Sequence, residues 1–372
     1  MSDRKIAFIK FGSFSYINTK VLEILQANFP QFTIDVIDVY PDLVSKRDIR
    51  SFVYCLKEFG IDILLRKKPF NTAIYLKLPY VFRKVKEASQ KRLSDRGYVF
   101  TFQTQSLFDA SVPEIPHFVY TDHTCLANLQ YPGFDPRDLP SQTWLEYEKN
   151  VYQNATLNFT MSSNVSRSII EDYDCDPDKI ACVYCGANVQ AKKDETFNDQ
   201  RFSDKNILFV GVEWRRKGGP VLVEAFKKVL ETYPDATLTI VGCKPKLNVP
   251  NCNVIGRVPI EDVRQYFQQA SIFCLPTKLE PFGIVFLEAM AYKLPIIGSD
   301  IGAIPELVIE GKNGYRVEPN NPQQLSQKII ELIGSPEKCK IFGEYGHELF
   351  WNRYTWEKTG IRIRENIEQF LT

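Results

Sequence analysis

The chain has 372 residues, with 46 Lys and Arg, 45 Asp and Glu and a net charge of +1. This length predicts about two domains, each large enough to bury a core. The balanced charge gives no reason to expect nucleic acid as a partner. Nine scattered cysteines, an odd number, argue against a disulfide framework and for a reducing compartment. Residues 1–10 lack the apolar region of a signal peptide. No run reaches the ~20 apolar residues of a membrane-spanning helix. We therefore expect a cytoplasmic protein whose contact with the inner face of a membrane, where it occurs, is peripheral.

Short apolar runs alternate with longer helical patterns along the chain, as is typical of a parallel α/β fold. In the first half, strands are expected at residues 6–11, 32–39, 98–102, 117–121, 156–160 and 180–184. Helices are expected at 16–27 and 142–153, with a long, mostly helical region before residue 98. The polar run at 190–200 has few apolar residues, so we interpret it as the connection to a second unit.

The second half repeats the alternation. Strands are expected at residues 206–211, 236–242, 253–256, 270–276 and 295–298. Helices are expected at residues 219–233, 260–268 and 354–370. The pattern therefore predicts a second α/β unit that ends in helices.

The region from Val44 to Arg96 is strongly basic, with fourteen Lys and Arg against five Asp and Glu. Apolar side chains are interleaved with these charges: Phe52, Tyr54, Phe59, Leu64, Leu65, Phe70, Tyr75, Tyr80 and Phe82. Basic residues beside aromatic ones suit an anionic membrane or a negatively charged acceptor. The same pattern fits helices with core aromatics and solvated bases equally well.

The most informative stretch is residues 276–291, where Glu280 and Glu288 stand eight positions apart. Pro281 is expected to open a helix here, because proline is tolerated in a first helical turn. Gly283 would let a ligand approach the backbone closely. The free N–H groups and positive dipole end of that turn suit a phosphate. Taken alone, the stretch also fits an ordinary amphipathic helix with two solvated acids.

Two further segments follow strands. Residues 211–219 carry Arg215, Arg216 and Lys217 between a strand and a helix, which suits a phosphate site or a solvated basic turn. Residues 298–306 form a strand end, a glycine-bearing turn and a new helix. Ligands bind beyond the carboxyl ends of strands in open parallel sheets, so the three segments together predict a binding site. No Gly-x-Gly-x-x-Gly or Walker loop supports dinucleotide redox or ATPase chemistry.

These segments together resemble family 4 of the retaining glycosyltransferases, over residues of about 207–330. Residues 280–291 are similar to the family's signature of two glutamates separated by seven residues, and 300–306 and 311–314 match its next blocks. The first half matches more loosely, at 184–188 and around His123. The resemblance implies an α/β protein of the GT-B type, with two Rossmann-like domains whose parallel sheets face a central cleft. We accordingly expect an acceptor-side domain at 1–188, a linker at 189–205, a nucleotide-sugar-binding domain at 206–353 and a terminal helix at 354–372 that packs back on the first domain.

The resemblance also implies roles for individual residues. Glu280 would bind hydroxyls of the donor sugar, Glu288 would bind the ribose, and Lys217 would neutralise the diphosphate. His123 would lie near the donor sugar, although a lone histidine is otherwise more often structural. The remaining donor contacts are expected from Arg216, Phe282, Gly283, Ile284, Gly211 and Gly12.

The implied activity is transfer of a sugar, with retention, from a nucleotide-diphosphate donor to a glycan, lipid, lipid-linked or small-molecule acceptor. Alternatives are a GT-B sugar-nucleotide epimerase, a sucrose-type synthase and a noncatalytic sugar-nucleotide or membrane-binding module. No metal or cofactor is expected. The pair Cys182 and Cys185 has no second pair at zinc spacing. The acidic run at 172–176 is interpreted as a solvated turn.

Overall fold

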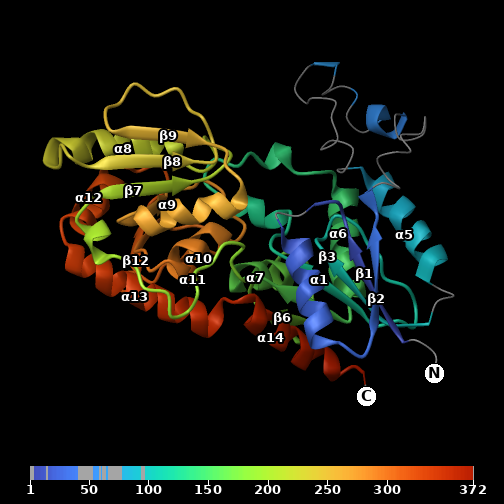
Figure 1. Ribbon diagram of the computed structural model, residues 1–372. Coiled ribbons are helices and arrows are strands. Elements are labelled where there is room, and N and C mark those ends of the chain that lie inside the picture. The colour runs from blue at the N-terminus through green and yellow to red at the C-terminus, as the bar shows by residue number, and fades with distance from the viewer. Residues whose placement is uncertain are drawn as a thin grey trace. The chain divides into compact units, whose positions relative to one another are not determined.

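The computed structural model describes residues 4–13, 16–40, 53–57, 60, 64–65, 78–93 and 97–371. Its contacts divide the chain into two compact units. The first unit comprises Met1–Leu129, Asp135–Val183 and Gly360–Thr372, and the second comprises Gln130–Phe134 and Tyr184–Thr359. Each unit contains a six-stranded sheet whose paired strands are all parallel (Figure 1). This architecture confirms the predicted α/β class with two parallel sheets.

The first sheet has the strand order β2-β1-β3-β4-β5-β6. Its strands are β1 (Lys5–Lys10), β2 (Thr33–Asp38), β3 (Tyr98–Thr104), β4 (His117–Thr121), β5 (Leu157–Thr160) and β6 (Ile180–Cys182). Its helices are α1 (Ile17–Asn28), α5 (Pro79–Leu93), α6 (Gln142–Asn154), α7 (Ser163–Glu171) and most of α14 (Trp356–Glu368). Because crossovers between parallel strands are right-handed, α1 lies on one face of the sheet and α5 and α6 on the other.

The two faces of this sheet differ in chemistry. One face carries a fully buried aromatic layer formed by Phe8, Phe100, Phe102, Phe118 and Phe159. The opposite face, under α5 and α6, carries polar side chains from β3 and β4 that are buried as well. Buried polar groups need hydrogen-bond partners. Here Gln103 takes its partners from the loop between β3 and β4, and Thr101 and His117 contact each other.

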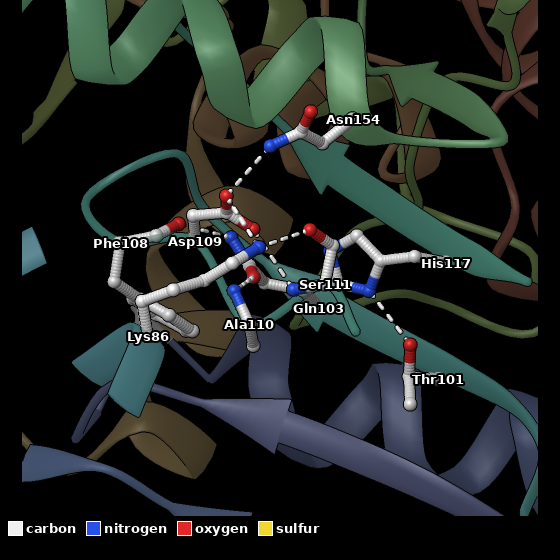
Figure 2. A network of polar contacts seen from close by, with 9 residues as sticks. All are labelled: Lys86, Thr101, Gln103, Phe108, Asp109, Ala110, Ser111, His117 and Asn154. Carbon is white, nitrogen blue, oxygen red and sulfur yellow. Dashed lines mark hydrogen bonds and ion pairs between the residues drawn. The ribbon is translucent and has the colours of Figure 1, made fainter. Parts of the chain in front are cut away.

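Figure 2 shows this polar network. The side chain of Gln103 donates to the carbonyl of Phe108 at 2.7 Å and accepts from the amide of Ala110 at 3.0 Å, which folds the loop back over β3. Lys86 of α5 and Asn154 of α6 then both donate to the Asp109 carboxylate, at 2.8 and 2.9 Å. The lysine holds the pKa of Asp109 below its usual range against the opposing effect of burial. The loop between β3 and β4 is therefore fixed by both helices.

The second sheet has the order β12-β11-β10-β7-β8-β9. Its strands are β7 (Asn206–Val210), β8 (Thr237–Val241), β9 (Cys252–Gly256), β10 (Ile272–Leu275), β11 (Ile296–Ser299) and β12 (Gly314–Val317). Its helices are α8 (Gly219–Thr232), α9 (Val263–Gln269), α10 (Ile284–Ala291), α11 (Ile304–Leu307), α12 (Pro322–Ile333) and α13 (Pro336–Arg353). Helix α8 packs with α12, and α10 packs with α13. Right-handed crossovers place α8 and α10 on opposite faces.

The basic region predicted as a membrane surface lies only partly among the described residues. Phe82 of α5 is buried against Trp144, and Lys86 is engaged with Asp109, so these two residues are structural. Leu64 and Leu65, by contrast, are 82% and 56% exposed. Four of its aromatic residues fall outside the described part: Phe52, Phe59, Phe70 and Tyr75. Within the part of the chain that is described, no helix has the length and apolar character needed to cross a membrane.

Candidate functional site

The candidate site lies where the strand order of the second sheet reverses. From β7 the chain proceeds to β8 and β9 on one side, and then β10 pairs with β7 on its other side. The loops that leave neighbouring strands at such a reversal diverge to opposite faces and open a crevice at the carboxyl end of the sheet. The three segments singled out in the sequence follow β7, β10 and β11, which are adjacent.

The turn after β7 packs closely against the loop after β10 and is hydrogen-bonded to it. Gly218 has a φ of 76°, and a Cβ placed there would lie 1.8 Å from the carbonyl oxygen of Pro276. Only glycine combines this backbone conformation with so close an approach. The carbonyl of Arg216 accepts from the amide of Lys278 at 2.8 Å and from the Thr277 hydroxyl at 3.2 Å. These contacts fix the positions of the two loops relative to each other.

The contacts between the two loops bring Lys217 and Glu280 together in an ion pair. Their side chains are only 14% and 7% exposed, so the pair is largely removed from water. The charge of Lys217 also opposes the rise that burial causes in the pKa of Glu288. The structure therefore gathers the lysine and both glutamates that the sequence had singled out.

Arg216 is used differently from Lys217. Its guanidinium donates to the carboxylate of Glu213 at 2.5 Å and to the carbonyl of Leu279 at 2.7 Å. In this arrangement Arg216 fastens the loop that carries Glu280. That Arg216 also supplies charge to a diphosphate stays a prediction.

The helix after β10 begins later than predicted. Pro281 does not open it: α10 starts at Ile284, and Gly283 is its N-cap, with a φ of 102°. The predicted start of the helix at Pro281 was therefore wrong, because residues 280–283 form a loop. Phe282 is 2% exposed and anchors this loop in the core. Gly283 and Ile284 nevertheless stand at a helix start, whose first N–H groups have no partner within the helix.

Glu288 lies inside α10 and is buried. Burial raises the pKa of its carboxyl to about 8, although backbone N–H groups of Val189 and Asn188 and the charge of Lys217 oppose the rise. The carboxyl therefore binds a proton near neutral pH. Hydroxyl groups of a ligand would compete with the backbone N–H groups of Val189 and Asn188 for the Glu288 carboxyl.

Tyr131 completes the support of Glu280, and sequence reasoning missed it. Its hydroxyl donates to the Glu280 carbonyl at 2.9 Å. A Cβ at Gly302 would lie 2.7 Å from that carbonyl oxygen and 2.9 Å from the Tyr131 hydroxyl, so the glycine makes room for the bond. These partners are 149 positions apart in the chain, and no local pattern signals such a contact.

His123 and Gly12 belong to the first unit. His123 follows β4 in the loop before the 3-10 helix at Leu126–Gln130, and burial lowers the pKa of its ring, so the ring is neutral at pH 7. Gly12 follows β1 with a φ of 56°. Its amide donates to Asp38 at 3.0 Å, and its carbonyl accepts from Asn18 at 3.0 Å. The roles of both residues toward a donor remain predictions.

The acidic run at 172–176 takes protein partners. Asp172 accepts from Ser168, Asp174 pairs with Lys149, and Asp176 caps a short 3-10 helix. Cys182 lies in β6, as the strand interpretation requires. Among the described residues, no group of three or more His, Cys, Asp or Glu side chains is arranged to hold a metal ion.

Comparison with known proteins finds a family match within the second unit. Residues 192–349 match the family described as glycosyl transferases group 1. A glycosyltransferase of unassigned function from Methanocaldococcus jannaschii is 33% identical over 192 residues, which cover 50% of this chain and 53% of the relative. A D-inositol 3-phosphate glycosyltransferase from Corynebacterium urealyticum is 27% identical over 67% of this chain and 65% of the relative. The matches thus span about half to two thirds of these relatives.

Solved structures share the fold over the whole chain. A sucrose-phosphate synthase from Thermosynechococcus elongatus superposes with a TM-score of 0.73, at 17% identity and 99% coverage of both chains. The Anabaena protein HepE, solved in complex with UDP and glucose, has a TM-score of 0.66 at 16% identity, with 98% of this chain and 99% of that chain covered. At these identities the likeness shows the fold, which is of the GT-B type.

Proposed function

Because residues 192–349 match the group 1 glycosyltransferases and the chain has the GT-B fold, we propose that it transfers a sugar from a nucleotide-diphosphate donor to an acceptor hydroxyl with retention of configuration. In this proposal Lys217 and the first amides of α10 bind the diphosphate. Glu280 binds hydroxyl groups of the sugar, Glu288 binds the ribose, and His123 takes part in the chemistry at the donor sugar. Relatives and structural neighbours that act on or bind nucleotide sugars support the donor class.

One observation carries the proposal: the buried pair of Lys217 and Glu280 at the strand reversal of the second sheet. Moving two charges out of water is unfavourable unless each has a partner. In the structure the two residues pair with each other. When a donor enters, its diphosphate can take over the lysine and its sugar hydroxyls can donate to the glutamate. The site thus offers a cation to one part of the donor and an acceptor to the other.

The chemistry follows from the charge that develops. As the glycosidic bond breaks, negative charge grows on the departing diphosphate, and fixed donors stabilise that charge more in the transition state than in the ground state. The sugar becomes oxocarbenium-like, as in glycoside hydrolysis. We propose that the acceptor attacks from the face that the diphosphate leaves and that the diphosphate receives its proton. Glu280 then needs no role as a nucleophile.

We further propose that no metal is needed, since Lys217 and the helix-start amides already meet the diphosphate charge. Turnover unchanged after treatment with EDTA is the expected result. Loss of activity with EDTA and recovery with Mg²⁺ or Mn²⁺ would contradict this part of the proposal.

The test of the function is a donor panel. UDP, GDP and ADP sugars are incubated with the protein, and slow donor hydrolysis is followed without and with candidate glycan and lipid acceptors. We expect one nucleotide class to be hydrolysed and its release to accelerate with an acceptor. Interconversion of the donor sugar without nucleotide release would indicate an epimerase. Binding of a donor without any turnover would indicate a noncatalytic module.

For the acceptor, we propose a lipid or lipid-linked molecule at an anionic membrane surface. The exposed Leu64 and Leu65, within a region of fourteen basic and five acidic residues, support this choice. Sedimentation with vesicles of anionic lipid at low salt tests it, with neutral vesicles as the control. Equal recovery of protein in the supernatant with both kinds of vesicle would contradict it.

A further inference from the structure

A buried acid in the first unit has no role in the function proposed above. Glu148 lies in α6 and is 1% exposed. Burial raises the pKa of its carboxyl to about 7. An acid at such a position is costly to keep unless it is fully hydrogen-bonded, so its partners indicate what it does.

Those partners come from four places in the first unit. The Ser106 hydroxyl, in the loop after β3, donates to Glu148 at 2.8 Å. The backbone amide of Cys125, in the loop after β4, donates to both carboxylate oxygens at 3.2 Å. The hydroxyls of Tyr152 and of Tyr173, which follows α7, also donate to it. One side chain thus ties two loops at the carboxyl end of the sheet to α6 and to the segment that follows α7.

The loop after β4 is the one that carries His123. Cys125, two positions on, is held by Glu148, and the next amide, of Leu126, donates to the Tyr173 hydroxyl at 3.0 Å. On the other side, the Thr121 hydroxyl donates to the carbonyl of His123 at 2.8 Å. The backbone around His123 is therefore fixed from both ends, and Glu148 is the group through which the downstream anchors meet.

Helix α6 also holds the preceding loop at a second point. Asn154, six positions after Glu148, donates to Asp109 at 2.9 Å (Figure 2). The loop between β3 and β4 is thus attached to α6 at Ser106 and at Asp109. This makes α6 the rigid support against which both loops are placed.

We propose that Glu148 is a positioning residue that sets the place of His123. The inference rests on the proposed function, because it gives His123 a part in donor chemistry. Misplacing a reacting group by about 1 Å lowers a rate by up to about 100-fold. Loss of the Glu148 anchor should therefore reduce kcat while leaving the binding of donor to the second unit unchanged.

The test compares Glu148→Ala and Glu148→Gln with Glu146→Gln. Glu146 lies on the same helix and is exposed, so it is a matched control. We expect Glu148→Ala to lower kcat at least about tenfold with an unchanged KM for the donor. Glu148→Gln, which keeps one acceptor oxygen for the Cys125 amide, should restore part of the rate. Circular dichroism and Tm identify variants that are folded at the assay temperature.

A second readout does not depend on activity. The chain has three histidines, so ring ¹H–¹⁵N spectra of selectively labelled protein give few signals. The His123 signal, assigned with His123→Ala, should shift in both Glu148 variants and stay in place in Glu146→Gln. An unmoved His123 signal in folded Glu148→Ala would overturn the proposal. Near-normal turnover of His123→Ala would show instead that the proposed function misassigned His123, and the inference would fall with it.

Discussion

The two units each bury an acid that contacts neighbouring loops, but with different partners. Glu280 in the second unit meets a cation, Lys217, in an ion pair. Glu148 in the first unit meets amide and hydroxyl donors, with no cation among its hydrogen-bond partners in the described residues. A carboxylate held by a flexible lysine can exchange that partner for a ligand. A carboxylate held by backbone and tyrosine donors is fixed. On the proposed function, Glu280 belongs to a binding site and Glu148 to a support that positions His123.

The largest effect on activity is expected when Lys217, the cation of the ion pair with Glu280, is removed. Lys217→Ala removes the charge proposed to stabilise the departing diphosphate and leaves Glu280 buried without its cation. Loss of one such stabilising group costs about 100- to 1,000-fold in kcat. Steady-state kinetics with the preferred donor measure this. Lys227→Ala, an exposed lysine of α8 paired with Glu224, is the control and should retain full activity. Comparable activity in both variants would contradict the assigned site.

Substitution of Glu280, the acid of the pair, should change the affinity for the nucleoside diphosphate in the opposite direction to substitution of Lys217. Glu280→Gln removes the charge that holds Lys217, so the lysine becomes free for a diphosphate. We expect kcat to fall about 100-fold, while the free nucleoside diphosphate binds a few times more tightly. Isothermal titration measures the affinity. Weaker binding of nucleoside diphosphate by this variant would show that Glu280 does not compete for the lysine.

Glycine substitutions test how closely the loop after β7 packs against the loop after β10. Gly218→Ala places a Cβ against the Pro276 carbonyl in a backbone conformation with φ of 76°. Gly311 has a similar φ of 70°, but a Cβ added there would meet nothing within 4 Å, so Gly311→Ala isolates the conformational cost. We expect Gly311→Ala to lower the free energy of unfolding by about 1 kcal/mol and Gly218→Ala by at least twice that amount. Urea unfolding compares the two. Equal losses would remove the argument for close packing of the loops.

A further prediction concerns pH. The folded pKa of Glu288 is about 8, above its ordinary value of 4.5. Its contribution to stability is therefore complete below pH 4.5 and is lost as pH rises through 8, with a slope of about 1.4 kcal/mol per pH unit between them. Glu288→Gln should flatten the decline in unfolding free energy between pH 5 and 8. Glu231→Gln, on the exposed side of α8, is the control and should decline like the wild type.

Much of the fold could be predicted from the sequence because it rests on local patterns. The apolar runs that became β7, β8 and β10 have the length and composition of buried strands, and their order along the chain dictates parallel pairing. The start of α10 could not be placed, because a proline is compatible with both a first helical turn and a loop. The positive φ of Gly283 decided between them.

The charged residues of the candidate site could be predicted from the sequence, but the hydrogen bonds that hold them in place could not. Lys217, Glu280 and Glu288 carry a spacing that the sequence displays. The hydrogen bonds from Tyr131 to Glu280 and from Arg216 to Leu279 join residues far apart in the chain, so no pattern reveals them. Glu148 did leave a signal: it stands on the buried stripe of α6, formed by Trp144, Glu148, Val151 and Tyr152. An acid at a core position of an amphipathic helix indicates a buried polar network.

The most direct test of the central claim is calorimetric titration of the nucleoside diphosphate chosen by the donor panel into the wild type and Lys217→Ala. If the lysine paired with Glu280 is the cation that receives the diphosphate, affinity should fall at least about tenfold, which is a loss of about 1.4 kcal/mol. Equal affinity of two folded proteins for the ligand would contradict the account.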